Sequence, residues 1–176
     1  VGVYSYGEVE RRTYYTMPIV EGQSLRDVLE GGPLDPERAT DLVEQVARAI
    51  DSAHQQRVVH RDLKPANVVL DAAGAPLVLD FGLAKDLLSG PELTRTGEIL
   101  GTPCYMSPEQ AAGETAYVDH RVDVYALGAI LYECLTGQRP YVGETATEVI
   151  AKILHEDPTP TRKLRPQISY ELETIV

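Results

Sequence analysis

The chain is 176 residues long, 43% of them hydrophobic, and it carries a formal net charge of −11 at pH 7. That length and composition are enough for one globular unit with a sizeable core, and they exclude a fibrous repeat or a disordered chain. The acidic balance argues against nucleic acid and against a membrane surface as partners, and no apolar run approaches the ~20 residues that a membrane-spanning helix needs.

Residues 1–20 alternate between apolar and polar positions. The segments 1–6 and 13–17 predict two strands joined by a turn. Because an isolated hairpin is marginal in water, we expect these strands to be the edge of something larger. Val1 is not an initiator Met, and residues 172–176 end within a predicted helix, so we expect a chain cut from a longer domain.

Helical spacing begins at Ser24. Leu25 and Leu29 share one face of a short helix, which ends at a Gly-Gly-Pro sequence. Asp35 and Pro36 then provide the N-cap and the first-turn proline of a long helix with an apolar face. This long helix is predicted to lie in the core.

In residues 57–85, short apolar runs replace the helical spacing. Short apolar runs at 68–70 and 77–79 predict small strands, with loops between them that hold polar residues toward solvent. Residues 86–118 are rich in Gly, Pro and Thr, and long irregular segments in compact domains are usually functional. Helical spacing returns in two further segments, 122–135 and 149–154.

One loop carries most of the recognisable chemistry. Residues 60–67 read His-Arg-Asp-Leu-Lys-Pro-Ala-Asn, and residues 80–82, farther along, read Asp-Phe-Gly. Phosphoryl transfer needs metal ions on the phosphates, a cation at the transferred group and an acceptor for the hydroxyl proton, and these residue types meet those needs. One such triplet recurs by chance, but the pair in this order and spacing is specific. The chain resembles the protein kinase superfamily, in particular the bacterial eukaryotic-like Ser/Thr protein kinases, over nearly its whole length.

This resemblance implies an α+β, protein kinase-like fold. We expect a mainly α-helical C-terminal lobe with short β-hairpins, and an N-terminal lobe that is largely missing. Residues 1–22 are then the end of the N-lobe sheet and the hinge, and residues 23–176 are a C-lobe that is incomplete at its C-terminus. The implied cofactors are ATP and Mg²⁺, and the implied substrates are proteins with Ser or Thr hydroxyls.

The resemblance also assigns the chemistry to individual residues. Asp62 accepts the proton of the substrate hydroxyl, and Lys64 lies against the γ-phosphate, as in Ser/Thr kinases. Asn67 and Asp80 hold Mg²⁺. The alternative is that these residues are only structural, with Asp62 capping a turn and Lys64 solvated. It requires residues suited to four independent catalytic roles to occur together by coincidence.

Three residues have structural roles by the same resemblance. His60 and Phe81 pack the loops in place and transfer no proton. Asp123 begins the central helix of the lobe and accepts backbone N–H bonds from the catalytic loop.

Residues 101–109 resemble the loop that positions the peptide substrate. In the family, Thr102 hydrogen-bonds toward the catalytic Asp and Lys, and Glu109 pairs with an arginine of a later helix. That helix is not in this chain, and Arg162 and Arg165 lie too early in the sequence to take the place of its arginine. We therefore expect a buried Glu109 without its partner, which costs several kcal/mol.

Thr94 and Thr96 resemble the twin threonines of the bacterial activation segment. A phosphate there adds ~1.5 to 2 negative charges, and Arg61 beside the catalytic aspartate is placed to pair with it. This predicts regulation by autophosphorylation, and self-association of two copies would allow that reaction in trans. Two ordinary loop threonines are the alternative.

Residues 17–22 resemble the hinge that binds adenine. Adenine needs a backbone carbonyl and then an N–H two residues on; Pro18 provides the carbonyl and Val20 the N–H. Met17 is expected at the back of the adenine pocket and Val69 beneath the ring, although both fit equally well as generic core residues.

The family's glycine-rich loop, its phosphate-binding lysine and the glutamate that holds this lysine are not found in the sequence, so we expect the isolated chain to be inactive. Two alternatives stay open: a truncated kinase-like binding or scaffold module without catalysis, and an aminoglycoside-type phosphotransferase, against which the Thr102 loop and the twin threonines argue. Cys104 and Cys134 form no CxxC pattern. Two unpaired cysteines are typical of a reduced, cytoplasmic domain. A membrane anchor of the parent protein would lie outside this chain.

Overall fold

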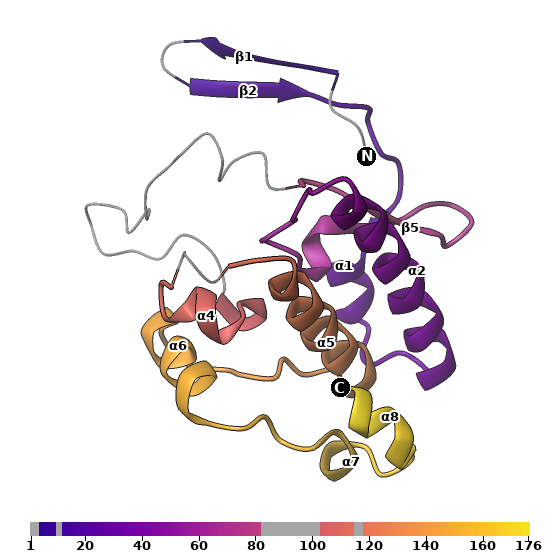
Figure 1. Cartoon of the computed structure of the whole chain (residues 1–176). Helices are drawn as coiled ribbons and strands as arrows, with labels where there is room; N and C mark the ends of the chain where they lie inside the picture. The colour runs from indigo at the N-terminus through magenta and orange to yellow at the C-terminus, as the bar shows by residue number, and fades with distance from the viewer. Residues whose placement is uncertain (1–3, 10–11, 82–102, 115–117) are drawn as a thin grey trace.

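The computed structural model describes residues 4–9, 12–81, 103–114 and 118–176 (Figure 1). In this part of the chain, a helical body carries one small sheet, and a separate β-hairpin lies at the N-terminal end. The short helices α7 and α8, near the C-terminus, lie at the end of the body opposite the hairpin. The expected α+β fold with a mainly helical lobe is confirmed.

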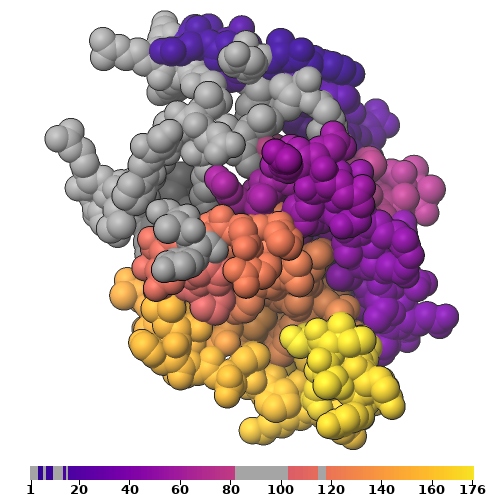
Figure 2. Space-filling model, in the orientation of Figure 1, coloured from indigo at the N-terminus to yellow at the C-terminus, as the bar shows by residue number. Residues whose placement is uncertain are grey.

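The hairpin consists of β1 (Ser5–Val9) and β2 (Arg12–Thr16). The strands pair antiparallel, and the hydroxyls of Ser5 and Thr16 lie 2.7 Å apart at the open end. The second predicted strand agrees with β2, but the first lies later than predicted. Residues 7–9, expected in the turn, belong to β1. Within the described residues they pair only with each other, and the hairpin lies at one end of the molecule (Figure 2).

Two helices begin at the caps that the sequence predicts. The hydroxyl of Ser24 accepts the N–H of Asp27 at the start of α1 (Leu25–Leu29). The carboxylate of Asp35 accepts the N–H of Glu37 at 3.0 Å at the start of α2 (Pro36–Gln55). Each cap satisfies an N–H that the first helical turn leaves without an internal partner, so these starts are decided locally.

The small sheet has the order β3-β4-β5, and both pairs are antiparallel. Its strands are β3 (Gln23–Ser24), β4 (Val68–Leu70) and β5 (Pro76–Val78). Every residue of β4 is buried, and the 3-10 turn η1 (Pro65–Asn67) leads directly into it. The sheet thus holds the end of the residue 60–67 loop against the core.

The centre of the body is α5 (Arg121–Thr136), which packs against α2. Ile130 and Leu135 are fully buried, and they pack with Val46 and Ile50 of α2 in one apolar core. Gly137 ends α5 in the left-handed conformation, with φ of 71°. Only glycine adopts this conformation at little cost, so this end is also decided locally.

A smaller apolar cluster joins Cys104, Tyr141, Val149 and Ile153 beside the main core. The remaining elements of the described chain are short or amphipathic: η2 (Pro103–Tyr105), α4 (Pro108–Ala111), α6 (Ala146–His155), α7 (Thr161–Leu164) and α8 (Tyr170–Ile175). Among the described residues, no helix is both long enough and apolar enough to cross a membrane. The division into residues 1–22 and 23–176 stays a prediction.

Candidate active site

The loop that leads into η1 is held by the carboxylate of Asp123, in the first turn of α5. Asp123 is 1% exposed, and its two oxygens accept the backbone N–H groups of His60 and Arg61, each at 2.8 Å. Its Oδ2 also accepts a hydrogen bond from Nε2 of His54, near the end of α2, at 2.7 Å. A buried carboxylate is tolerated where such donors surround it. This one fixes the backbone immediately before Asp62.

His60 joins the two loops that carry the candidate catalytic residues. Its ring is fully buried, with its centroid 5.0 Å from that of Phe81. Nδ1 accepts the backbone N–H of Asp62, so Nε2 carries the ring proton and donates to the carbonyl oxygen of Leu79 at 2.8 Å. The imidazole therefore links the backbone of Asp62 to the residue that precedes Asp80.

Asp62 and Lys64 form a direct pair. Nζ of Lys64 lies 2.7 Å from Oδ2 of Asp62, and the side chains are 31% and 50% exposed, respectively. The exposure separates Asp62 from Asp123: the buried carboxylate is occupied by the protein's own donors, whereas the carboxylate of Asp62 is open to an incoming hydroxyl. The geometry therefore gives Asp123 a structural role and leaves Asp62 available for chemistry.

Asn67 is hydrogen-bonded both to the loop that carries this pair and to the segment that leads to Asp80. Its Nδ2 donates to the carbonyl oxygen of Asp62 at 2.9 Å, which directs the amide oxygen away from that carbonyl. The carbonyl oxygen of Asn67 accepts the N–H of Leu79 at 2.8 Å, so the residue is also tied to the segment that follows β5. Asp80 is exposed and has a φ of 57°. A non-glycine residue in this conformation is uncommon and is often found at functional sites.

Asn67 and Asp80 suit magnesium by their chemistry. Mg²⁺ takes oxygen ligands, and in phosphoryl-transfer sites one or two protein carboxylates act together with phosphate oxygens and water. An amide oxygen that a neighbouring carbonyl orients, and an exposed carboxylate, are donors of this kind.

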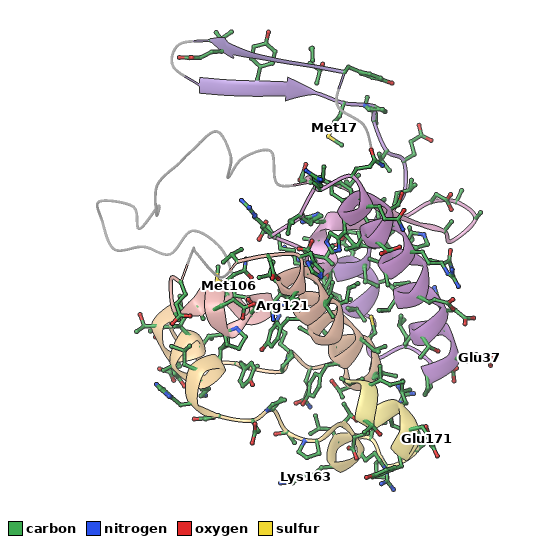
Figure 3. All side chains as sticks on the ribbon, viewed as in Figure 1. Met17, Glu37, Met106, Arg121, Lys163 and Glu171 are labelled. Atoms are coloured by element: carbon green, nitrogen blue, oxygen red, sulfur yellow. The ribbon has the colours of Figure 1, made fainter. Side chains whose placement is uncertain are left out.

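The segment that resembles the adenine hinge connects β2 to β3. A Cβ atom on Gly22 would lie 2.2 Å from the carbonyl oxygen of Leu70 and 2.7 Å from Cγ1 of Val69, so the backbone passes directly over β4. Ile19 is 94% exposed, and Met17 lies between the hairpin and the helical body (Figure 3). Three residues here are partly buried: Met17, Pro18 and Val20. The structure thus brings Gly22, at the end of this segment, close to Val69.

Tyr105 anchors the start of the segment that resembles the peptide-positioning loop. Its hydroxyl donates to Oε2 of Glu133 in α5, and Nε of Arg139 lies 3.7 Å from Oε1 of the same carboxylate. Burial, and then the hydrogen bond to Glu133, raise the pKa of Tyr105 far above its usual value. Burial likewise raises the pKa of the neighbouring Cys104, whose thiol is therefore protonated at neutral pH.

Gln110 connects the same segment to the loop of residues 60–67. Its Oε1 accepts the backbone N–H of Ser107 at 3.1 Å, and its Nε2 donates to the carbonyl oxygen of Arg61 at 2.9 Å. Sequence reasoning missed Gln110, as it missed His54 and Tyr105. The spacing of Ser107 and Gln110 is a capping-box signal that would have found the first bond, but nothing local predicts the second.

Glu109 differs from its expected burial. It is partly exposed, and its charge makes a small contribution to the raised pKa of Arg121, most of which comes from a hydrogen bond to Asp119. Arg165 instead donates to backbone carbonyl oxygens of Leu34 and Leu135, the latter at 2.9 Å. The expected cost of an unpaired, buried carboxylate does not arise, because water reaches Glu109.

Three of the predicted residues lie outside the described part of the chain: Thr94, Thr96 and Thr102. Their roles in regulation and in substrate positioning stay predictions.

Comparisons with known proteins agree with the resemblance. A family model described as "Protein kinase domain" matches residues 1–176. The serine/threonine-protein kinase PknB of Mycobacterium tuberculosis is 40% identical over 182 residues, which cover 100% of this chain and 29% of that protein. PknB of Mycobacterium leprae is 39% identical over 181 residues, and PrkC of Bacillus subtilis is 39% identical over 177 residues, with 29% and 27% of those proteins covered.

The chain thus spans less than a third of the length of these curated relatives. The family match nevertheless extends from the first residue to the last, and it includes the loop that Asp123 holds and the Asp80 segment. The chain belongs to the protein kinase domain family.

Proposed function

We propose that this chain is the C-lobe part of a Ser/Thr protein kinase, which transfers the γ-phosphate of ATP to protein Ser and Thr hydroxyls. The observation that carries the proposal is the Asp62–Lys64 pair at 2.7 Å, open to solvent on a loop whose backbone is held by Asp123. The relatives are named serine/threonine-protein kinases.

In the proposed reaction, Asp62 accepts the proton of the attacking hydroxyl. A bond forms between the hydroxyl oxygen and the γ-phosphorus, and the bond from that phosphorus to the bridging oxygen of ATP breaks, so that ADP leaves. Lys64 holds the transferred group through its positive charge and keeps the Asp62 carboxylate in place.

Asn67 and Asp80 would hold magnesium through an amide oxygen and a carboxylate oxygen. When bound there, the metal would supply positive charge that neutralises the negative charge developing on the phosphate groups. Pro18 and Val20 would bind adenine through backbone groups, between Met17 and Val69.

Arg61 would pair with a phosphate on Thr94 or Thr96, added by a second copy of the protein. A cytoplasmic location suits this chemistry, because ATP is available there.

The test is a phosphotransfer assay on the full-length protein that contains this chain, with Mg-ATP and peptides bearing Ser, Thr or Tyr. We expect Ser and Thr phosphorylation that Asp62→Asn reduces by at least about 100-fold. Asp41→Asn, at an exposed aspartate of α2, is the matched control and should leave turnover unchanged.

Failure of the full-length protein to phosphorylate any peptide would overturn the proposal. Binding of ATP without turnover would then indicate a binding module, and transfer to an aminoglycoside but to no peptide would indicate a small-molecule phosphotransferase. The isolated 176-residue chain is expected to turn over poorly, since the family's glycine-rich loop is not in its sequence.

A further inference from the structure

We propose that Gln110 is a positioning residue that couples the peptide-binding segment to the catalytic loop, beyond its local role at the start of α4. The inference rests on the proposed kinase function for its consequence, although the contact itself does not depend on that function. It concerns a side chain to which neither the motifs nor the family comparison gives a role.

The side chain of Gln110 makes bonds in two directions. Its amide oxygen accepts the backbone N–H of Ser107 at 3.1 Å, with the hydroxyl of Ser107 farther away at 3.4 Å. Its amide nitrogen donates to the carbonyl oxygen of Arg61 at 2.9 Å, across 49 residues of sequence. One planar amide therefore touches both the segment after Tyr105 and the residue before Asp62.

The backbone of Arg61 needs support from hydrogen bonds of this kind. It has a φ of 65°, a conformation that a residue with a Cβ atom adopts only where its surroundings enforce it. Its N–H is held by Oδ1 of Asp123 at 2.8 Å, and its carbonyl is held by Gln110. Both sides of the strained residue are thus fixed, one from α5 and the other from α4. The next residue in the chain is Asp62.

The two bonds of Gln110 serve different purposes, which makes them separable. A capping box needs only an acceptor at the third helical position, and glutamate fills that position as well as glutamine does. The bond to Arg61 needs a donor, which a carboxylate lacks. Gln110→Glu therefore keeps the cap and removes the bridge, and it places a negative charge against a carbonyl oxygen.

Loss of the bridge should act on the chemical step. Misplacement of a catalytic group by about 1 Å can lower a rate by about 100-fold, and a loosened backbone at Arg61 moves Asp62 by part of that distance. We expect Gln110→Glu to lower kcat roughly 10-fold and to raise KM for the peptide. KM for ATP should not change, because the hydrogen bonds of Gln110 go to Ser107 and Arg61, and neither residue is proposed to bind nucleotide.

The experiment compares three variants of the full-length protein with the parent. Gln110→Glu removes the bridge alone, and Gln110→Met removes both the bridge and the cap. Gln45→Glu makes the same change at an exposed position of α2 and is the control. The measurements are kcat, both KM values, the thermal unfolding midpoint, and hydrogen exchange of the backbone amides in residues 60–67.

We expect both changes at Gln110 to lower kcat and to speed exchange in residues 60–67 by at least about 5-fold, while Gln45→Glu does neither. Gln110→Glu should unfold within about 2 °C of the parent, and Gln110→Met earlier. The proposal is overturned if Gln110→Glu matches the parent in exchange and in kcat, or if losses appear only in Gln110→Met, together with its stability. An inactive parent protein would contradict the kinase proposal, and the exchange measurement would still decide whether the bridge exists.

Discussion

The backbone N–H of His60 donates to the carboxylate of Asp123 at 2.8 Å, although 63 residues separate the two in the sequence. The same buried carboxylate holds Arg61 and His54, so the catalytic loop, the end of α2 and the start of α5 meet at one side chain. Asp62 performs the proposed chemistry, but its position is decided by this second aspartate, which substrate does not reach.

Asp123→Ala should therefore destabilise the fold as well as the site. The change leaves buried N–H donors without an acceptor, each at a cost of about 1–3 kcal/mol, so we expect the free energy of unfolding to fall by at least about 3 kcal/mol. Asp119→Ala is the control, because Asp119 pairs with Arg121 in solvent and its loss should leave the free energy of unfolding nearly unchanged. Urea denaturation measures both, and equal stability of the two variants would contradict the role of Asp123.

Lys64→Met should separate chemistry from stability. The pair with Asp62 is open to solvent, so its loss should change the free energy of unfolding by less than about 1 kcal/mol. The positive charge beside the proposed transferred group is also lost, and we expect kcat to fall by about 100-fold or more. Lys163→Met, on α7 at the end of the molecule opposite the hairpin (Figure 3), should leave both quantities unchanged. A Lys64→Met variant with normal kcat would show that this lysine takes no part in the reaction.

Gly22→Ala should disturb the hinge segment. The new Cβ would meet the carbonyl oxygen of Leu70 at 2.2 Å, so β3 has to move away from β4, and we expect a loss of about 2 kcal/mol or more together with weaker nucleotide binding. Gly128→Ala, within α5, has its nearest new neighbour at 3.9 Å and should instead stabilise the protein by up to about 1 kcal/mol. Thermal unfolding and nucleotide titration of the two variants provide the comparison; unchanged ATP affinity in Gly22→Ala would argue against a hinge at this place.

Alkaline pH should weaken the fold through Cys134. Burial raises the pKa of this thiol from 9.0 to about 12, so above pH 9 the unfolded chain loses the proton while the folded chain keeps it. Stability is therefore complete below pH 9 and falls as the pH rises toward 12. Between pH 9 and 10 the parent should lose about 1 kcal/mol more than Cys134→Ala, which lacks the titrating group. Denaturation of both proteins at pH 8, 9 and 10 tests this, and parallel losses would mean that the thiol ionises as easily inside the fold as outside.

The sequence by itself determined the elements whose causes are local. Ser24 and Asp35 cap their helices with their own side chains, and Gly137 ends α5 in a conformation suited to glycine. The Asp62 and Asp80 motifs were readable because their residue types and spacing lie within short stretches of chain. The resemblance placed Val69 beneath the adenine ring, which stays a prediction, whereas the close approach of Gly22 to β4 was found only in the structure.

Tertiary structure alone decided which side chains meet across the fold. His54 reaches Asp123 over 69 residues, Tyr105 reaches Glu133 over 28, and Gln110 reaches Arg61 over 49. It also left Glu109 partly exposed, where the family pattern predicted burial. Periodicity and capping depend on neighbours within about one helical turn, so they place each element but carry no information on the packing of α2, α4 and α5 that brings these partners within 3 Å.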